Sequence, residues 1–121
     1  MYSAITLRRQ LERAATENNI RLRYSLKNVR VNGVLKGCSG HVVDSETGIC
    51  VYMTTDVGSY KPLSDKAMYR LAKNERDYSS NSLKSGYNRW TKTGSLPYCV
   101  IDLIKNERKK VNGDAAFSCG A

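Results

Sequence analysis

The stretch Ile20-Arg-Leu-Arg-Tyr-Ser-Leu-Lys-Asn-Val-Arg-Val-Asn-Gly-Val-Leu-Lys-Gly-Cys-Ser-Gly-His-Val-Val43 decides the fold. Apolar and polar residues alternate along much of its first half, which is the period of a strand with one buried face. Asn32-Gly33 then gives the strongest turn signal in the chain, because both central residues of a tight hairpin turn need a positive φ, which Asn and Gly tolerate. We therefore expect a strand over 20–31 and an antiparallel partner over 34–43.

The turn also determines which side chains of this hairpin share a face. If Val31 pairs with Val34, every second residue of each strand falls on one face, and that face collects most apolar side chains of the second strand. We expect this face to lie against helices. Its members are then Val29, Val31, Val34, Cys38 and Val42, with Ile49, Val51 and Met53 of a third strand.

The same parity places three apolar side chains of the first strand on the wrong side. Leu22, Tyr24 and Leu26 are even-numbered, so the simple register directs them away from the helices. An extra residue in one strand would reverse the parity and return them to the core. We predict such a bulge near Lys27 or Asn28.

Elements outside the hairpin follow from apolar periodicity and from capping and turn residues. A helix is expected over 3–18, a third strand over 49–55, a second helix over 64–74 and a last helix over 95–111. The fold class is α+β, with an N-terminal helix, a three-stranded antiparallel meander and then two helices packed on one sheet face. Residues 1–113 form a single domain in this interpretation, and 114–121 a flexible tail.

Charge points to the class of partner. The chain has 121 residues, with 20 Lys and Arg against 11 Asp and Glu, so its net charge is +9. Such a surplus favours anionic partners, which are nucleic acid, a nucleoprotein or an anionic membrane face. The start of the chain lacks the apolar core of a secretory signal, and no stretch approaches the roughly 20 apolar residues of a membrane span. We expect a cytoplasmic protein without a membrane partner.

Residues 79–94 read Ser-Ser-Asn-Ser-Leu-Lys-Ser-Gly-Tyr-Asn-Arg-Trp-Thr-Lys-Thr-Gly, with no acidic residue and no apolar period. Cations attract phosphates, and flat rings provide a platform on which unpaired bases stack. The alternative is that the two rings anchor a long loop by burial. The predicted binding residues are Lys84, Tyr87, Arg89, Trp90 and Lys92, with Lys66, Arg70, Lys73 and Arg76 on the outer side of the expected second helix.

Catalytic and metal-binding patterns are weak. Cys38 and His41 would point to opposite faces of an extended strand, and the four cysteines have spacings unlike those of a zinc site. The carboxylates Asp44, Glu46 and Asp56 lie at turns or strand ends, where acidic residues are usually solvated. The sequence therefore favours a non-enzymatic binding protein with no catalytic residue, metal or cofactor. A small metal-dependent nuclease stays as the second alternative.

Two resemblances add expectations. The α-β-β-β-α order over about 3–74 resembles the topology of the double-stranded-RNA-binding domain, although Ser-Asp-Lys-Ala stands where that family has Lys-Lys-x-Ala-Lys. Leu35-Lys-Gly-Cys-Ser-Gly-His41 and the segment 69–78 resemble short proteins of bacterial phages and mobile elements. This likeness implies an accessory factor in a bacterial host that contacts nucleic acid or a nucleoprotein. The alternative that it implies is an anti-CRISPR inhibitor, which binds a CRISPR effector nuclease directly.

Overall fold

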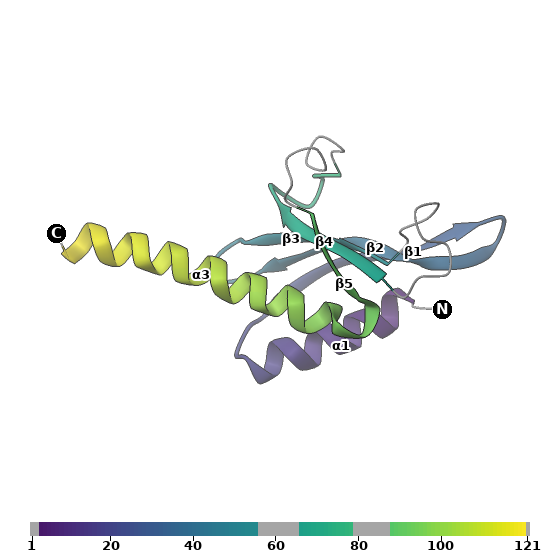
Figure 1. Ribbon diagram of the computed structural model, residues 1–121, viewed down its shortest axis with the longest axis horizontal. Coiled ribbons are helices and arrows are strands. Elements are labelled where there is room, and N and C mark those ends of the chain that lie inside the picture. Colours follow the sequence, from purple (N-terminus) through teal and green to yellow (C-terminus); the bar gives the residue numbers. More distant parts are fainter. Residues whose placement is uncertain (1–2, 56–65, 79–87, 121) are drawn as a thin grey trace.

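The computed structural model describes the backbone of residues 3–55, 66–78 and 88–120, and the side chains of these ranges up to residue 110. Its elements are α1 (Ala4–Glu17), β1 (Leu22–Val31), β2 (Val34–Asp44), β3 (Cys50–Thr54), β4 (Lys66–Ala72), β5 (Arg89–Lys92), a 3-10 turn (Thr93–Ser95) and α3 (Leu96–Gly120). The strands form one antiparallel sheet in the order β1-β2-β3-β4-β5, and both helices lie on the same face of it (Figure 1). The expected α+β class is confirmed.

Helix α1 begins and ends where the sequence predicts, to within two residues. The Ser3 hydroxyl accepts a hydrogen bond from the Thr6 backbone N–H at 3.2 Å, which is N-capping geometry. Leu7 and Leu11 are fully buried, one turn apart on the same side of the helix. Asn19 has φ of 56° just after the helix ends, the left-handed conformation that commonly terminates helices.

The β1–β2 hairpin turns at the predicted residues. Asn32 and Gly33 have φ of 51° and 77°, and Val31 pairs directly with Val34. Two successive positive φ values are what a tight hairpin turn needs, because its twist then matches the twist of the strands. The turn chemistry was therefore sufficient to fix the connection between these strands.

The predicted bulge exists, but it lies on the partner strand. Arg30 pairs with Leu35 and Val29 pairs with Gly37, so Lys36 of β2 is the extra residue. The prediction placed the bulge near Lys27 or Asn28, a few residues further from the turn and on β1. A bulge leaves one residue unpaired and shifts the register of everything beyond it.

The bulge reverses the parity of β1, as the core required. Tyr24 now pairs with Val42, and Leu22 and Leu26 lie on the same face, packed against the buried core. The bulge has the opposite effect on the residues nearer the turn, which do not face the helices. Val31 and Val34 keep 50% and 55% of their surface exposed, so the prediction that they belong to the core was wrong.

The core lies between the sheet and the two helices. It contains Leu7, Leu11, Ala14 and Ala15 of α1, Cys38, Val42, Val51, Met53 and Ala67 of the sheet, and Leu96, Val100, Ile101 and Ile104 of α3. Gly40 allows β1 to approach β2 closely, because a Cβ at this position would lie 2.0 Å from the Ser25 carbonyl oxygen. The core face of the sheet therefore needs glycine at position 40.

Residues 66–72, predicted as part of a second helix, form strand β4. They pair with β3 from Thr54↔Met68 to Cys50↔Ala72. The strand is buried on both sides, since Ala67 faces the helices while Met68 and Arg70 are buried on the other face. A strand buried on both faces has no clean alternation of apolar and polar residues, and its apolar positions can match a helical period by chance.

Helix α3 continues to Gly120, past Asn112-Gly113, where the sequence predicts its end. Leu96, Val100 and Ile104 form its buried side, as expected. No helix in the described parts of the chain combines the length and the apolar character that a membrane span requires.

A buried ion pair attaches α3 to the end of β2. The Asp44 carboxylate is fully buried, and Arg108 donates to both of its oxygens at 2.6 and 2.7 Å. Thr47 and the backbone N–H of Glu46 donate to the same carboxylate. Although burial alone raises the pKa of Asp44, these hydrogen bonds bring it below its usual value of 3.8. The expectation that Asp44 is merely solvated was wrong.

We expect Arg108→Ala to lower the free energy of unfolding by about 3 kcal/mol, because it leaves the Asp44 charge buried without its bidentate partner. Lys109→Ala, one position further along the exposed side of α3, is the matched control and should change stability by less than about 0.5 kcal/mol. Urea unfolding of the two variants at pH 7 measures the difference. Equal stabilities would contradict the role given to this pair.

Candidate functional site

We call the side of the sheet that faces away from α1 and α3 the distal face. The strand register places the following side chains on it: Arg23, Ser25, Lys27 and Val29 of β1; Ser39, His41 and Val43 of β2; Cys50, Tyr52 and Thr54 of β3; Lys66, Met68, Arg70 and Ala72 of β4; Trp90 and Lys92 of β5. None of these is Asp or Glu, whereas Lys and Arg occur on three of the five strands. The distal face is therefore cationic.

Three rings pack together at the centre of this face. His41 lies beside Tyr52, its register partner, with ring centroids 5.1 Å apart. Tyr78, which follows β4 in the chain, contacts both rings edge-on at 4.8 and 5.5 Å. Such tilted and edge-on contacts are favourable for aromatic pairs. The segment after β4 thus folds back over the middle of the distal face.

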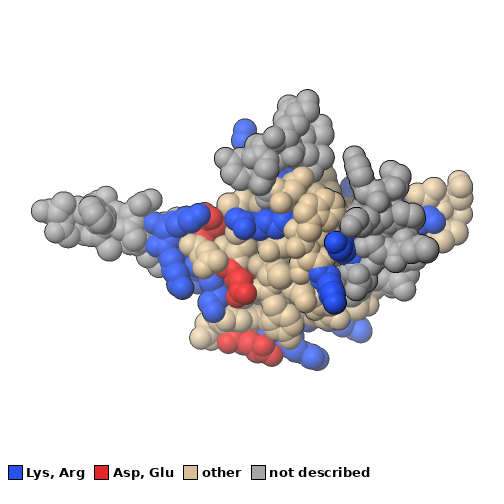
Figure 2. All heavy atoms as spheres, viewed as in Figure 1, with Lys and Arg blue, Asp and Glu red and all other residues tan. Residues whose placement is uncertain are grey.

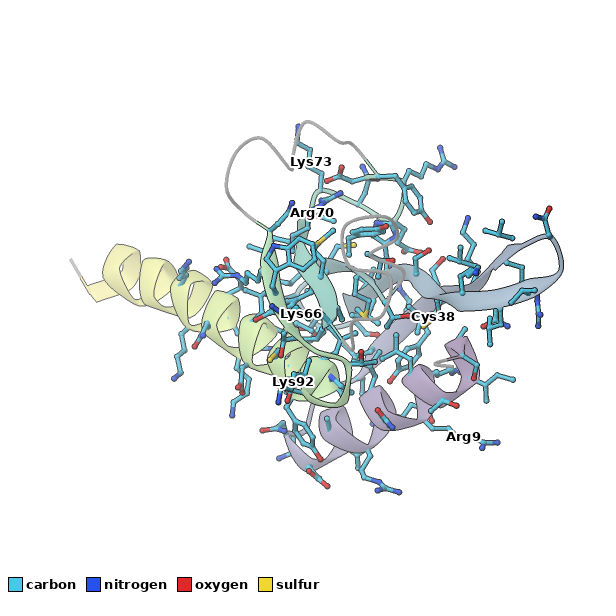
Figure 3. The ribbon with its side chains drawn as sticks, turned by 45° about the vertical axis from the view of Figure 1, so that its right-hand side comes forward. Arg9, Cys38, Lys66, Arg70, Lys73 and Lys92 are labelled. Atoms are coloured by element: carbon cyan, nitrogen blue, oxygen red, sulfur yellow. The ribbon has the colours of Figure 1, made fainter. Side chains whose placement is uncertain are left out.

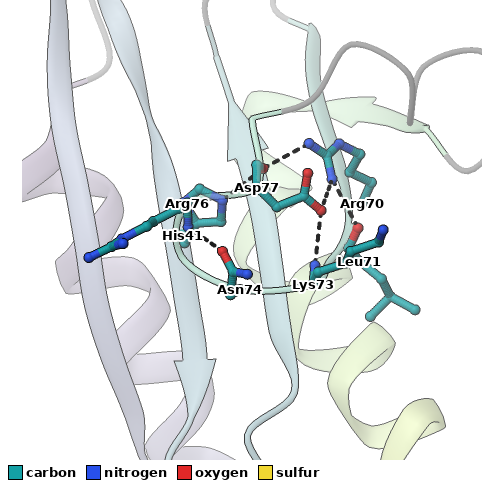
Figure 4. Close-up of polar contacts among 7 residues, drawn as sticks. All are labelled: His41, Arg70, Leu71, Lys73, Asn74, Arg76 and Asp77. Atoms are coloured by element: carbon teal, nitrogen blue, oxygen red, sulfur yellow. Dashed lines mark hydrogen bonds and ion pairs between the residues drawn. The ribbon is translucent and has the colours of Figure 1, made fainter.

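Asp77 holds this segment in place (Figure 4). Arg70 is only 1% exposed, and its guanidinium donates to the Asp77 carboxylate at 3.3 Å and to the Asp77 carbonyl at 3.0 Å. The backbone N–H of Lys73 donates to the same carboxylate at 2.9 Å. The guanidinium also lies over the Tyr52 ring, 4.9 Å from its centroid. Asp77 neutralises a charge that burial would otherwise make very costly.

His41 is part of the same cluster and is held in its neutral form. Its Nε2 lies 3.1 Å from the Asp77 carbonyl oxygen, which can only accept, so Nε2 carries the proton. Nδ1 is buried and has no hydrogen-bond partner among the described residues. Burial lowers the pKa of His41 from its usual 6.5, and the positive charge of Arg70 acts in the same direction, against the opposing effects of Asp77 and Glu75.

A second feature of the distal face is an exposed ring beside two Lys residues. Trp90 keeps 54% of its surface exposed although it lies in a strand. Lys92 is two residues further along the same face, and Lys66 faces it directly across β4 and β5 (Figure 3). Like charges placed opposite each other in a sheet are unfavourable. We name Lys66, Trp90 and Lys92 the Trp90 patch.

The structure separates the other predicted binding residues. Arg89 lies on the helix side of β5, where it shares a hollow with Asp102 of α3. Arg70 is buried and paired, so its predicted place on the outer side of a helix was wrong. Lys73 and Arg76 are exposed, but they follow the far end of β4 from Lys66. The remaining two, Lys84 and Tyr87, fall outside the described residues.

Lys and Arg also predominate over Asp and Glu on the side of the molecule shown in Figure 2. Two of the acidic side chains near the distal face are engaged, because Glu75 pairs with Arg23 at 3.1 Å and Asp77 pairs with Arg70. The exposed Arg23–Glu75 pair contributes little to stability, but it neutralises the Glu75 carboxylate. The field at this face favours a negatively charged ligand.

Sequence reasoning missed the cluster of His41, Tyr52, Arg70, Asp77 and Tyr78. The sequence indicates only that His41 faces away from Cys38, whereas the structure buries it fully beside Tyr52. The available signal was Asp77-Tyr78, an acidic and an aromatic residue separated from the end of β4 by four residues. The contact of these two residues with His41 can be predicted only if 66–72 is recognised as a strand.

The geometry limits the chemistry of this region. Cys38 and His41 do lie on opposite faces, and burial raises the pKa of the Cys38 thiol, so they do not form a nucleophile and base pair. Asp44 is occupied by Arg108. Among the residues that the structure describes, no group of three His, Cys, Asp or Glu side chains is placed to hold a metal ion.

Comparisons of this chain with protein-family models, with curated proteins and with solved structures return no match.

We expect Asp77→Asn to lower the free energy of unfolding by about 3 kcal/mol, because Arg70 is then a buried charge without a counter-charge. Glu75→Gln is the matched control, since the Arg23–Glu75 pair is exposed and such pairs contribute about 1 kcal/mol or less. Chemical denaturation measures both. A loss for Glu75→Gln as large as for Asp77→Asn would show that burial of the pair is not what matters.

The unfolding free energy should fall as the pH is lowered through about 6.5. The unfolded chain takes up a proton near that pH, whereas folded His41 has a lowered pKa and resists protonation, so acid favours unfolding. His41 is the only histidine of the chain, which makes the assignment direct. His41→Gln should remove this dependence between pH 7.5 and about 5.5. An unchanged pH profile in the variant would contradict the neutral, buried state.

Proposed function

We propose that the protein is a non-enzymatic binding protein that contacts single-stranded nucleic acid through the distal face, with the Trp90 patch as the point of contact. The observation that carries the proposal is a half-exposed Trp beside a facing pair of Lys residues, on a sheet face whose strand residues include no carboxylate. The rings of bases stack on aromatic side chains, and Lys neutralises phosphates without reading sequence.

The arrangement of the helices favours a single strand over a duplex. Readout of B-DNA commonly places a helix or a two-stranded ribbon in the major groove, and both α1 and α3 lie on the opposite side of the sheet from the patch (Figure 1). The α-β-β-β-α order of the double-stranded-RNA-binding domain is interrupted, because residues 66–72 are a strand. An unpaired base, in contrast, needs only an accessible ring.

An accessory role for a phage or mobile element, in the cytoplasm of a bacterial host, fits a small basic protein of this kind. The partner is then a nucleoprotein whose single strand is exposed, such as the displaced strand of a CRISPR effector nuclease. Direct inhibition of such a nuclease without contact to its nucleic acid is the competing function. Binding to free oligonucleotides distinguishes the two.

Trp90→Ala should weaken binding to an oligothymidine by about 5- to 150-fold, which corresponds to the 1–3 kcal/mol of one stacked base. Fluorescence anisotropy with labelled single-stranded and duplex DNA measures the affinities. We expect the single strand to bind more tightly. The proposal fails if the duplex binds as well as the single strand, or if the protein binds a purified effector nuclease but no free nucleic acid.

Lys66→Ala and Lys92→Ala together should reduce the slope of log affinity against log salt by about 1.4, since each phosphate contact on a single strand contributes about 0.7. Arg9→Ala with Arg13→Ala removes the same charge from the exposed side of α1, as the labelled Arg9 in Figure 3 illustrates. This control should leave the slope within about 0.3 of the wild-type value. Equal losses from the two double variants would mean that only net charge matters.

A further inference from the structure

The outer edge of β1 presents hydrogen-bonding groups. Among the described residues β1 pairs with β2 alone, so it is an edge strand of the sheet. The Ser45 backbone N–H donates to the Arg21 carbonyl at 2.9 Å, so the backbone polar groups of Arg21 point toward the β2 side of the strand. Because antiparallel strands alternate inward and outward residues, the N–H and C=O groups of Leu22, Tyr24 and Leu26 point outward, away from β2.

This edge lacks several devices that usually protect an edge strand. β1 spans ten residues, contains neither Pro nor Gly, and carries no extra residue, because the bulge is in β2. Long regular edges readily accept another strand, whereas short, bulged or Pro-containing edges do not. The remaining protection is charge, and charge discriminates between partners.

Two hollows adjoin the edge where α1 meets β1, and residues of both sheet faces line them. One has a volume of about 620 Å³ and the other about 320 Å³, and both are lined by Arg8 of α1 and Tyr24 of β1. Ala15, Ile20 and Leu22 line the larger one, together with Glu12, Arg21 and Arg23. Leu26 lines the smaller one, together with Lys27 and Tyr78. Every second side chain of an added strand would therefore meet a partly apolar recess between α1 and the sheet.

The distal rim of these hollows is cationic. Arg21, Arg23 and Lys27 are exposed and follow the distal side of β1, about 4.8 Å from where the backbone of an added strand would run. Of the described carboxylates, Glu75 is the one that pairs with any of these three, and this exposed pair is weak. Acidic side chains on the added strand would face these cations.

We propose that the outer edge of β1 is a docking site for an extended segment of a partner protein in which apolar and acidic residues alternate. The segment adds to the sheet edge by main-chain hydrogen bonds, with its apolar side chains in the two hollows and its acidic side chains against Arg21, Arg23 and Lys27. A second copy of β1 does not fit, because it would bring like charges together along the whole edge. The site lies at the opposite edge of the sheet from the Trp90 patch and does not depend on it.

The test is residue-resolved amide exchange by NMR, with an acetylated seven-residue peptide of alternating Glu and Val as the probe. In the uncomplexed protein, amides of Leu22, Tyr24 and Leu26 should exchange faster than those of Arg23 and Ser25, which bond to β2. Saturating peptide should slow exchange at the first three at least tenfold and leave the other two unchanged. The same peptide with Lys in place of Glu should bind at least tenfold more weakly.

A charge-reversed variant provides the matched comparison. Arg23→Glu with Lys27→Glu should weaken peptide binding at least tenfold, while Lys105→Glu with Lys109→Glu, which changes the net charge equally on α3, should change it less than threefold. The exchange pattern of the wild-type protein decides the matter even if the first variant is poorly folded.

Three results would overturn the proposal. The first is no change in exchange at the outward amides at millimolar peptide. The second is protection of these amides by oligothymidine, which would make nucleic acid the occupant. The third is their protection in the protein alone as its concentration rises, which would make a second copy the occupant.

Discussion

The single extra residue at Lys36 is the constraint on which the rest of the structure depends. The Asn32-Gly33 turn fixes Val31 opposite Val34, and without a bulge the alternation of the strands would then send Leu22, Tyr24 and Leu26 away from the helices. The bulge reverses the parity, so these side chains complete the core under α1. The same reversal sends Arg23 and Lys27 to the distal face.

One parity thus determines both faces of the sheet. On the helix side it buries the apolar residues and Asp44, whose charge is met by Arg108 from α3. On the distal side each strand contributes a ring or a cation, and none of the strand residues there is acidic. Arg70 is fully buried on that side, and Asp77 neutralises it from outside the sheet. What stays exposed is Trp90 with its neighbouring lysines, and the cationic edge of β1.

The parts of the fold that could be predicted are those that neighbouring residues determine. The capped helix from Ser3, the turn at Asn32-Gly33 and the third strand follow from short-range rules of capping, φ and alternation. Strand β4 could not be recognised in this way, because Arg70 interrupts its apolar pattern and is buried only through a partner seven residues later. For the candidate site, the sequence indicates the chemistry of Trp90 and Lys92. Their separation from Arg89 depends on strand β5, which the sequence pattern does not predict.

The register itself can be measured by NMR, and it tests the central claim most directly. In antiparallel strands, residues that face each other without exchanging hydrogen bonds bring their Hα atoms into close contact. The structure predicts Hα–Hα nuclear Overhauser effects between Tyr24 and Val42 and between Leu22 and Asp44. A hairpin without the bulge would place Tyr24 opposite His41 instead. Contact between those two residues would contradict the parity on which the core and both proposed binding surfaces rest.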